Sequence, residues 1–379
     1  MAPDTVRLWL GTSPDDGPDG PPGGIWSVDL DAAAGTLGEP VLRARTPTPS
    51  FVALSTDGAS LFAVGETTPG AVTRFAVDAR GGLTQAERVS SGGSGPCHLL
   101  AHPDGRALYV ANYVSGSVGV LPLRPGAEGA QEVAGGVAQV FEHSGRGPVA
   151  DRQDGPHAHS TLLTPDGAVL LAFDLGTDEI RRYHVRPDGL LDADGVAARL
   201  PAGTGPRHAA WGPGDHLYVT GELDAAVHVL AWDGRELHPV DVVPAREPGA
   251  PQEALTAHVV VHGGLVLASV RGPDVVAAWR PDGGAGLAPA GVLAVGTPGP
   301  GAEGPGAGRP GAVWPRHFAV VPGPTGDWLV VAGQRAGRVV VLRLADVLAA
   351  RRTGEPVATA LLPAPTCVVA GRVVPPDPG

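Results

Sequence analysis

The chain alternates between turns that contain Gly beside Asp or Gly and short hydrophobic runs that stop at a polar residue. Copies of this pattern occupy residues 56–66, 103–113, 165–175, 213–222, 263–271 and 325–334. A turn of this kind ahead of a hydrophobic run predicts a β-hairpin. Further strand-like runs follow at residues 72–77, 117–121, 179–185, 226–230, 275–279 and 338–342. The pattern therefore predicts many short strands in an ordered repeat.

The repeat has a nearly constant length. The equivalent residues Glu66, Tyr113, Leu175, Glu222, Arg271 and Gln334 are separated by 47, 62, 47, 49 and 63 positions. A period of about 45–50 residues with four strands is typical of β-propeller blades. The two long steps predict loop insertions near residues 124–157 and 296–314.

A seventh copy lies at residues 6–37, but it lacks the hydrophobic run that precedes the turn elsewhere. Such a run, Pro365–Val369, lies near the end of the chain. We therefore expect an all-β fold, a single seven-bladed β-propeller domain over residues 1–379. The C-terminal strand would complete the first blade and close the ring, which protects the edges of the sheets.

Composition refines this prediction. The 57 Gly and 40 Pro punctuate hydrophobic runs and indicate turns between strands. A net charge of −12 argues against nucleic acid and anionic membranes as partners. We find neither a signal peptide nor an apolar stretch approaching 18 residues, so we expect a cytoplasmic protein. Cys97 and Cys367 are expected to be small buried hydrophobic residues, and metal-ligand spacing is lacking, so we expect no metal and no cofactor.

Polar residues recur where the strands of each hairpin begin and end. The strand before each turn begins at Ser50, Cys97, His159, Arg207, Ala257 or Arg316. The run after the turn returns antiparallel, so its end lies beside that start. One mouth of a propeller would then be lined by Glu66, His159, Arg207, Glu222, Arg271, Arg316 and Gln334. An imidazole, carboxylates and guanidiniums in one funnel suit acid–base chemistry on an anionic substrate.

Other polar residues near this mouth have less specific patterns. His98, His208, His258 and His317 share one repeated position, next to the start of the first strand, and are interpreted as structural. Arg152 and Gln153 lie on an insertion beside His159, where they cap the site, bind substrate or serve a purely structural role. His157 is two residues from His159 and so can share its face of a strand.

Eight short segments of the chain form a set whose order matters. They are Gly95–His98, Val110–Tyr113, Arg152-Gln153, Pro156–His159, Asp174–Asp178, Gly205–His208, Glu222–Asp224 and Pro315–Phe318. Taken in this order, they resemble the propeller lactonases. Bacterial 6-phosphogluconolactonase and fungal carboxy-cis,cis-muconate lactonizing enzyme typify this family. The resemblance implies a metal-free site built from His159, Arg207, Glu222 and Arg271. The chain departs from the family pattern at Val270–Asp274, at Gly333–Arg335 and at Gly65-Glu66.

The resemblance implies hydrolysis of a lactone, such as 6-phosphogluconolactone or a related carboxylated lactone. His159 or Glu222 is the general base; two flanking Arg should lower the pKa of Glu222, which favours His159. Arg207 and Arg271 would hold the anionic group and polarise the carbonyl. The expected substrate-binding residues are Arg152, Gln153, His157, Arg316, Gln334 and Glu66.

Two other functions stay open at this stage. One is a lactonizing enzyme or isomerase that acts on a carboxylate substrate with the same residues. The other is a non-catalytic propeller that serves as an interaction scaffold, because a fold alone does not determine function. For the lactonase, we expect a small anionic lactone as partner and a monomer or homodimer.

Overall fold

The strands of this chain form antiparallel sheets in which most strands pair with their neighbours in sequence. The computed structural model describes residues 5–13, 23–126, 130–246, 254–283, 286–296, 312–349 and 355–374. Within these residues there are seven sheets of four or five strands, and helix is confined to two short segments. The chain divides into two units, residues 51–244 with 282–287 (the four-sheet unit) and residues 1–50, 245–281 and 288–379 (the three-sheet unit), which are described separately.

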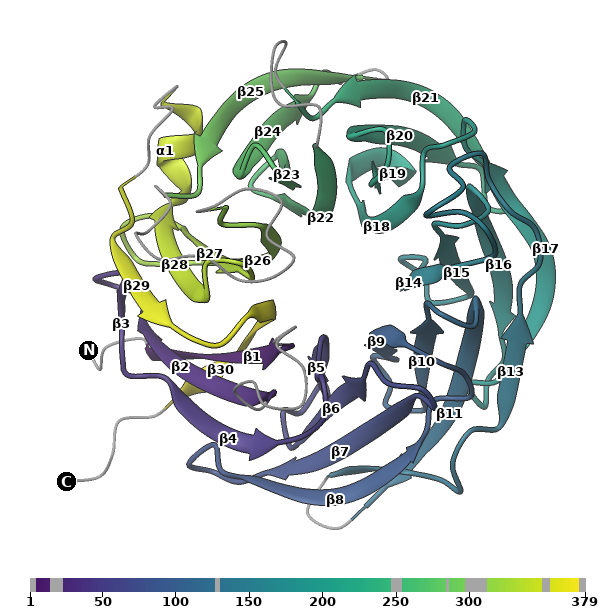
Figure 1. Ribbon diagram of the computed structural model, residues 1–379, viewed down its shortest axis with the longest axis horizontal. Coiled ribbons are helices and arrows are strands. Elements are labelled where there is room, and N and C mark those ends of the chain that lie inside the picture. Colours follow the sequence, from purple (N-terminus) through teal and green to yellow (C-terminus); the bar gives the residue numbers. More distant parts are fainter. Residues whose placement is uncertain are drawn as a thin grey trace. The chain divides into compact units, whose positions relative to one another are not determined.

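The four-sheet unit contains four successive repeats of the sequence pattern (Figure 1). Its first two sheets contain β5 (Val52–Leu54), β6 (Ser60–Gly65), β7 (Ala71–Val77) and β8 (Leu83–Ser90), then β9 (Pro96–Ala101), β10 (Ala107–Asn112), β11 (Ser117–Pro125), β12 (Gln131–Val133) and β13 (Gln139–Glu142). The next two contain β14 (Ala158–Leu163), β15 (Val169–Asp174), β16 (Glu179–Val185) and β17 (Leu191–Arg199), then β18 (Pro206–Trp211), the 3-10 turn η3 (Pro213–Asp215), β19 (His216–Gly221), β20 (Ala226–Trp232) and β21 (Leu237–Pro244).

The three-sheet unit has the same strand order within each sheet. Two sheets contain β22 (Leu255–His262), β23 (Leu265–Arg271), β24 (Val275–Pro281) and β25 (Leu287–Ala294), then β26 (Pro315–Val321), β27 (Trp328–Gly333), β28 (Arg338–Arg343), α1 (Leu344–Leu348) and β29 (Ala358–Leu361). The third contains β1 (Thr5–Thr12), β2 (Gly24–Asp31), β3 (Thr36–Leu37), β4 (Val41–Arg45) and β30 (Pro365–Val374).

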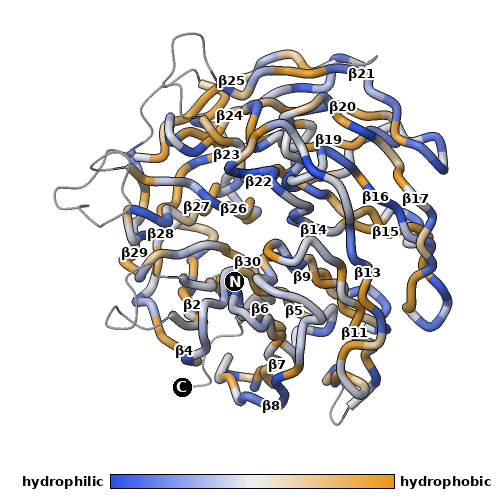
Figure 2. Tube along the Cα trace, turned by 45° about the vertical axis from the view of Figure 1, so that its right-hand side comes forward, coloured by the Kyte–Doolittle hydropathy of each residue, from blue (hydrophilic) through white to orange (hydrophobic). Residues whose placement is uncertain are grey.

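The second strand of a repeat is buried on both faces, which explains its uninterrupted hydrophobic sequence. In β10, Leu108 and Val110 pack in the core against the preceding sheet, whereas Tyr109 and Ala111 pack against the following one. Strands β15 and β27 divide their side chains between two cores in the same alternating way. Figure 2 shows hydrophobic stretches along the strands and hydrophilic stretches at many of the turns. Sheet-on-sheet packing therefore supplies the core of each unit.

Strand β30 completes the sheet that begins the chain. It pairs antiparallel with β1, from Thr5 opposite Val374 to Thr12 opposite Pro365. Cys367 and Val368 of β30 are buried, and Val368 joins the core that β1, β2 and the sheet of β26–β29 share. The prediction that the C-terminal strand completes the first repeat is confirmed.

The insertion near residues 124–157 is only partly a loop. Residues 131–133 and 139–142 form β12 and β13, which both pair with β11 and together supply the outer strand of that sheet. The prediction of a loop was wrong there because Val133 and Phe141 pack as core residues, although the sequence around them is rich in Gly. Of the second insertion, residues 297–311 lie outside the described residues.

We expect truncation of β30 to destabilise the chain. A protein that ends after residue 362 leaves one edge of β1 without its partner and exposes the side chains that pack on Val368. Its free energy of unfolding should fall by about 3 kcal/mol or more. Urea unfolding followed by circular dichroism measures this loss, with a chain that ends after residue 374 as the control. Equal midpoints for the two chains would contradict a stabilising role of β30.

Candidate active site

The candidate residues at the start of each first strand lie at irregularities in strand pairing. In β14 the pairing with β15 passes from Ala158 opposite Asp174 to Ser160 opposite Phe173, so His159 has no opposite residue. In β18, Arg207 and His208 lie between the pairs formed by Pro206 and Ala209. A β-bulge bends the strand and redirects the side chain at the extra residue. The bulges therefore interrupt the simple in-and-out alternation that the sequence analysis assumed.

Glu222 is the centre of the polar cluster in the four-sheet unit. It directly follows β19, and its side chain is 3% exposed. Glu222 Oε2 lies 2.7 Å from Arg207 Nε, and Glu222 Oε1 lies 2.5 Å from Arg152 Nη2. Two guanidiniums at this distance favour the ionised carboxylate. The sequence placed Arg207 and Glu222 at one mouth and Arg152 on an insertion beside His159, and the structure brings the three into direct contact.

Arg152 reaches Glu222 from the segment between β13 and β14. Burial acts to lower the pKa of Arg152, but the charge of Glu222 and hydrogen bonds with Glu222 and Tyr113 outweigh it and raise this pKa. Arg152 therefore stays protonated and links Tyr113 to the carboxylate. Burial raises the pKa of Tyr113, opposed by the hydrogen bond and the charge of Arg152.

Tyr113 also contacts two candidate histidines, His157 and His159, through its ring. Its ring stacks on His157 with centroids 4.4 Å apart and meets the His159 ring edge-on at 5.7 Å. The carbonyl oxygen of Tyr113 lies 2.9 Å from His157 Nδ1. The sequence analysis missed this residue as a site member, although Tyr113 occupies the same position after its strand as Glu222 does. That equivalence was the signal that could have identified it.

The structural histidines extend the aromatic contacts around His159. The His208 ring lies 5.3 Å from that of His159 and 5.5 Å from that of His98, centroid to centroid. Burial, followed by the positive charge of Arg207, lowers the pKa of His98 to about 3. His98 is therefore neutral at physiological pH, and its Nδ1 accepts a 3.4 Å hydrogen bond from the Thr161 amide. This contact fits the structural role expected for His98.

Gln153 anchors the loop that carries Arg152 and is fully buried. Its Nε2 donates hydrogen bonds of 2.8 Å to Leu175 O and to Asp178 Oδ1, and its Oε1 accepts one of 3.2 Å from the Val149 amide. Because these partners engage its amide group, we assign Gln153 to the structural role that the sequence left open rather than to substrate binding.

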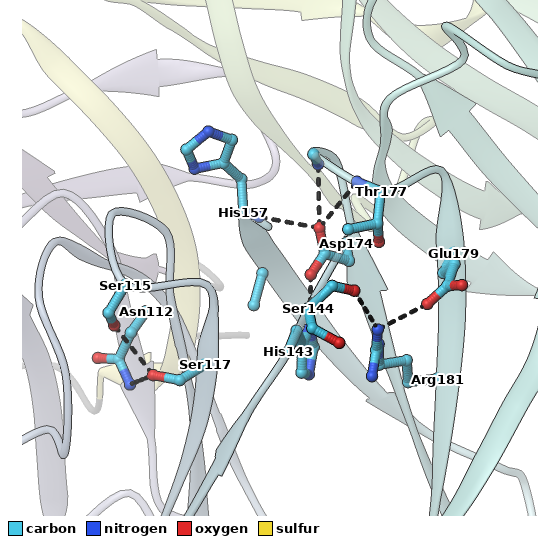
Figure 3. Close-up of polar contacts among 12 residues, drawn as sticks. Asn112, Ser115, Ser117, His143, Ser144, His157, Asp174, Thr177, Glu179 and Arg181 are labelled. Atoms are coloured by element: carbon cyan, nitrogen blue, oxygen red, sulfur yellow. Dashed lines mark hydrogen bonds and ion pairs between the residues drawn. The ribbon is translucent and has the colours of Figure 1, made fainter. Parts of the chain in front are cut away.

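Asp174, at the end of β15, fixes both ends of the same loop (Figure 3). Its Oδ1 accepts amide hydrogen bonds from His157, Gly176 and Thr177 at 2.8–3.1 Å. Its Oδ2 lies 2.5 Å from Nδ1 of His143, whose Nε2 lies 2.8 Å from the Tyr183 hydroxyl. The segment from residue 143 to residue 157 is thus held at its start, at Gln153 and at its end.

The remaining predicted site residues belong to repeats other than that of Glu222. Glu66 follows β6 in the four-sheet unit, at the position equivalent to Glu222, and is half-buried. Arg271, Arg316 and Gln334 belong to the three-sheet unit. There, Arg271 Nη2 donates a 3.0 Å hydrogen bond to Thr256 O, and Arg316 Nη1 donates one of 3.4 Å to Gln334 Oε1. Their participation in catalysis or substrate binding stays a prediction.

The described residues lack both a metal-binding cluster and a membrane-spanning helix. No group of three or more His, Cys, Asp or Glu side chains there is arranged to hold a metal ion. No helix in this part of the chain is long and apolar enough to cross a membrane.

Comparison with known proteins identifies the family. Residues 7–300 match the family model described as lactonase, 7-bladed beta-propeller. The chain belongs to this lactonase family. The predicted fold class, an all-β seven-bladed propeller, and the predicted enzyme class, a lactonase, are thereby confirmed. The single-domain organisation expected over residues 1–379 stays a prediction.

Three lactonase relatives match between 78% and 97% of the chain. The 6-phosphogluconolactonase of Bacillus subtilis is 30% identical over 355 residues, which are 91% of this chain and 93% of that protein. The 6-phosphogluconolactonase of Formosa agariphila is 26% identical over 312 residues, covering 78% of this chain and 80% of that protein. The solved structure of the periplasmic gluconolactonase of Pseudomonas aeruginosa matches with a TM-score of 0.82 and 27% identity, over 97% of this chain and 99% of that one.

We expect Asp174 to make the free energy of unfolding fall at acidic pH. Burial acts to raise the pKa of Asp174, but the hydrogen bond and charge of His143 and the amide of His157 outweigh it, so the pKa lies below its ordinary value. The folded protein then binds fewer protons than the unfolded chain. The contribution is complete above about pH 4 and is lost as the pH falls through the folded pKa.

Urea unfolding at a series of pH values, from pH 6 down to the lowest pH at which the protein stays folded, tests this linkage. Asp174→Asn should be less stable at pH 6 and should lose part of the acid dependence. The control Asp192→Asn changes an exposed residue of β17 and should leave that dependence intact. If Asp174→Asn and wild type lose stability in parallel as the pH falls, the proposed linkage is wrong.

Proposed function

We propose that this protein hydrolyses a sugar lactone, such as 6-phosphogluconolactone or a related carboxylated lactone, without a metal ion. Membership of the lactonase family and the 6-phosphogluconolactonase relatives support the reaction class. The observation that carries the proposal is the buried Glu222 carboxylate held by Arg207 and Arg152, with His159 and Tyr113 in the same cluster. The cytoplasmic location stays a prediction, since the Pseudomonas relative is periplasmic.

His159 is the general base in this mechanism. Both oxygens of Glu222 face guanidiniums, which disfavour protonation of the carboxylate, so Glu222 orients Arg207 and Arg152 instead. An imidazole titrates near neutral pH and can take a proton from water and return it. The bulge at His159 and the edge-on contact with Tyr113 position this imidazole within the cluster.

Hydrolysis then proceeds through one tetrahedral intermediate. The water oxygen bonds to the lactone carbonyl carbon as its proton passes to His159, and the carbonyl oxygen becomes an oxyanion. Arg207 and the Tyr113 hydroxyl stabilise that charge, since preorganised donors act where charge develops. When the intermediate collapses, the bond from the acyl carbon to the ring oxygen breaks. Protonated His159 gives its proton to the departing alkoxide, which leaves a hydroxy acid.

The scaffold reading has less support. An interaction platform would be expected to expose a contiguous apolar patch. Among the described residues, the seven exposed large apolar side chains come from separate positions along the chain, on strands, loops and the short helix: Val41, Val114, Val140, Val149, Val242, Leu348 and Leu361. A polar cluster with paired guanidiniums suits a small anionic ligand better.

Replacing the base should abolish most of the activity. His159→Ala is expected to lower kcat for lactone hydrolysis by about 10²- to 10⁴-fold, the usual contribution of a general base. The matched control is His216→Ala, at the opposite end of β19 from Glu222. Glu222→Gln should also reduce kcat but keep the acidic limb of the pH–rate profile, because the base is unchanged. Loss of that limb in Glu222→Gln alone would assign the base to Glu222.

A panel of lactones tests the reaction class and metal independence. Purified protein should hydrolyse at least one of 6-phosphogluconolactone, gluconolactone and simple γ- and δ-lactones, equally well with and without chelator. Continuous detection of acid release measures the rate, and Arg207→Ala should reduce it. Loss of activity in chelator would contradict metal independence. If no lactone reacts faster than its spontaneous rate, a lactonizing or isomerising role on a carboxylate would replace this proposal.

A further inference from the structure

The three-sheet unit contains a tryptophan in an unusual backbone conformation. Trp314 precedes β26 and has a φ of +59°. The equivalent residues before β9 and β18 are Gly95 and Gly205, with φ of +59° and +62°, and each of the three is followed by Pro. Glycine adopts this left-handed region freely, whereas a bulky side chain there is strained. Strained residues of this kind cluster at functional sites.

The surrounding structure holds Trp314 in place through its backbone. Asp274 Oδ1 accepts a 3.0 Å hydrogen bond from the Trp314 amide, and Asp274 Oδ2 accepts one of 2.7 Å from the Val313 amide. The Trp314 carbonyl accepts a 3.1 Å hydrogen bond from the Gln334 amide. The indole itself is half-buried and is not among the core residues that the structure describes for this unit. Core packing therefore does not account for a tryptophan at this position.

The indole ring instead holds two guanidiniums. Arg335 Cζ lies 3.4 Å from the Trp314 ring centroid, and Arg271 Cζ lies 5.5 Å from it. Arg271 also donates a hydrogen bond to Thr256 O, so Arg335 is the main candidate for ligand binding. The planar N–H groups of a guanidinium that contacts an aromatic ring match the oxygens of a phosphate. Among the described residues, no carboxylate forms an ion pair with Arg335. Asp274 acts on it electrostatically, but both oxygens of that carboxylate accept backbone amides.

A third guanidinium, that of Arg316, is linked to Trp314 through Gln334. Arg316 donates a hydrogen bond to the Gln334 side chain, and the backbone amide of Gln334 donates one to the Trp314 carbonyl. Arg271 and Arg335 thus lie over the Trp314 ring, and Gln334 links Arg316 to the backbone of the same residue. Such an arrangement recognises a doubly charged phosphate better than a singly charged carboxylate or a neutral hydroxyl.

We propose that Trp314, Arg335, Arg271 and Arg316 form a binding site for a phosphate monoester, and that this site selects phosphorylated over unphosphorylated lactones. The selection for lactones rests on the proposed function; the phosphate site does not. Arg335 is the residue to test because it contacts Trp314 most closely and because no role had been assigned to it.

Kinetics and direct binding together test the site. Arg335→Gln should lower kcat/KM for 6-phosphogluconolactone by about tenfold to a hundredfold, mainly through KM, because hydrogen bonds to charged groups contribute this much. The value for gluconolactone should change less than twofold. Arg335→Lys, which keeps the charge but not the planar group, should be intermediate. The control Arg343→Gln removes another guanidinium–Trp contact, the one with Trp328, and should leave kcat/KM unchanged for both substrates.

Calorimetry with 6-phosphogluconate and gluconate separates this site from the lactonase proposal. Wild type should bind 6-phosphogluconate more tightly than gluconate, and Arg335→Gln should remove that difference while thermal melting stays unchanged. If no lactone is hydrolysed but binding of 6-phosphogluconate depends on Arg335, the lactonase proposal fails and the phosphate site stands. If lactones are hydrolysed while Arg335→Gln affects both lactones equally or neither, or if 6-phosphogluconate does not bind, the phosphate site is overturned.

Discussion

The packing of sheet against sheet is the interaction on which the rest of each unit depends. A strand such as β10 or β15 can present hydrophobic residues at consecutive positions only because a neighbouring sheet covers each of its faces. This packing fixes where the paired strands begin and end. It therefore places the residues that follow β10 and β19, Tyr113 and Glu222, against residues of adjacent repeats, and the polar cluster is a consequence of how the core is built.

The repeat and the strands could be predicted because they depend on local signals, and so could the proximity of Arg207 and Glu222 at adjoining strand ends. Each hairpin has its own turn residues and its own hydrophobic run, and the equivalence of Glu222 with Arg271 follows from counting along them. The pairing of β30 with β1 could also be predicted. The first repeat lacked one of its strands, and the strand-like run near residue 365 belonged to no other repeat. The phosphorylation state of the substrate and the oligomeric state leave no comparable local signal.

Features that depend on contacts between distant residues could not be predicted. The bulges at His159 and Arg207 appear only in the pairing register, and they undo the alternation that a regular strand implies. Gln153 lies in a loop whose sequence does not reveal that its amide is enclosed by Leu175, Asp178 and Val149. The strain at Trp314 is likewise invisible in sequence, because a Trp-Pro pair carries no sign of its φ.

The pairing of the first strand with the last also has a consequence for how the protein is made. Strand β1 leaves the ribosome about 350 residues ahead of its partner β30, as the register between Thr12 and Pro365 shows. Throughout that interval one edge of β1 presents unpaired amide and carbonyl groups beside a hydrophobic surface, which is the condition under which nascent chains pair wrongly or aggregate. A chaperone that covers this edge, or rapid completion of translation, would protect it during synthesis.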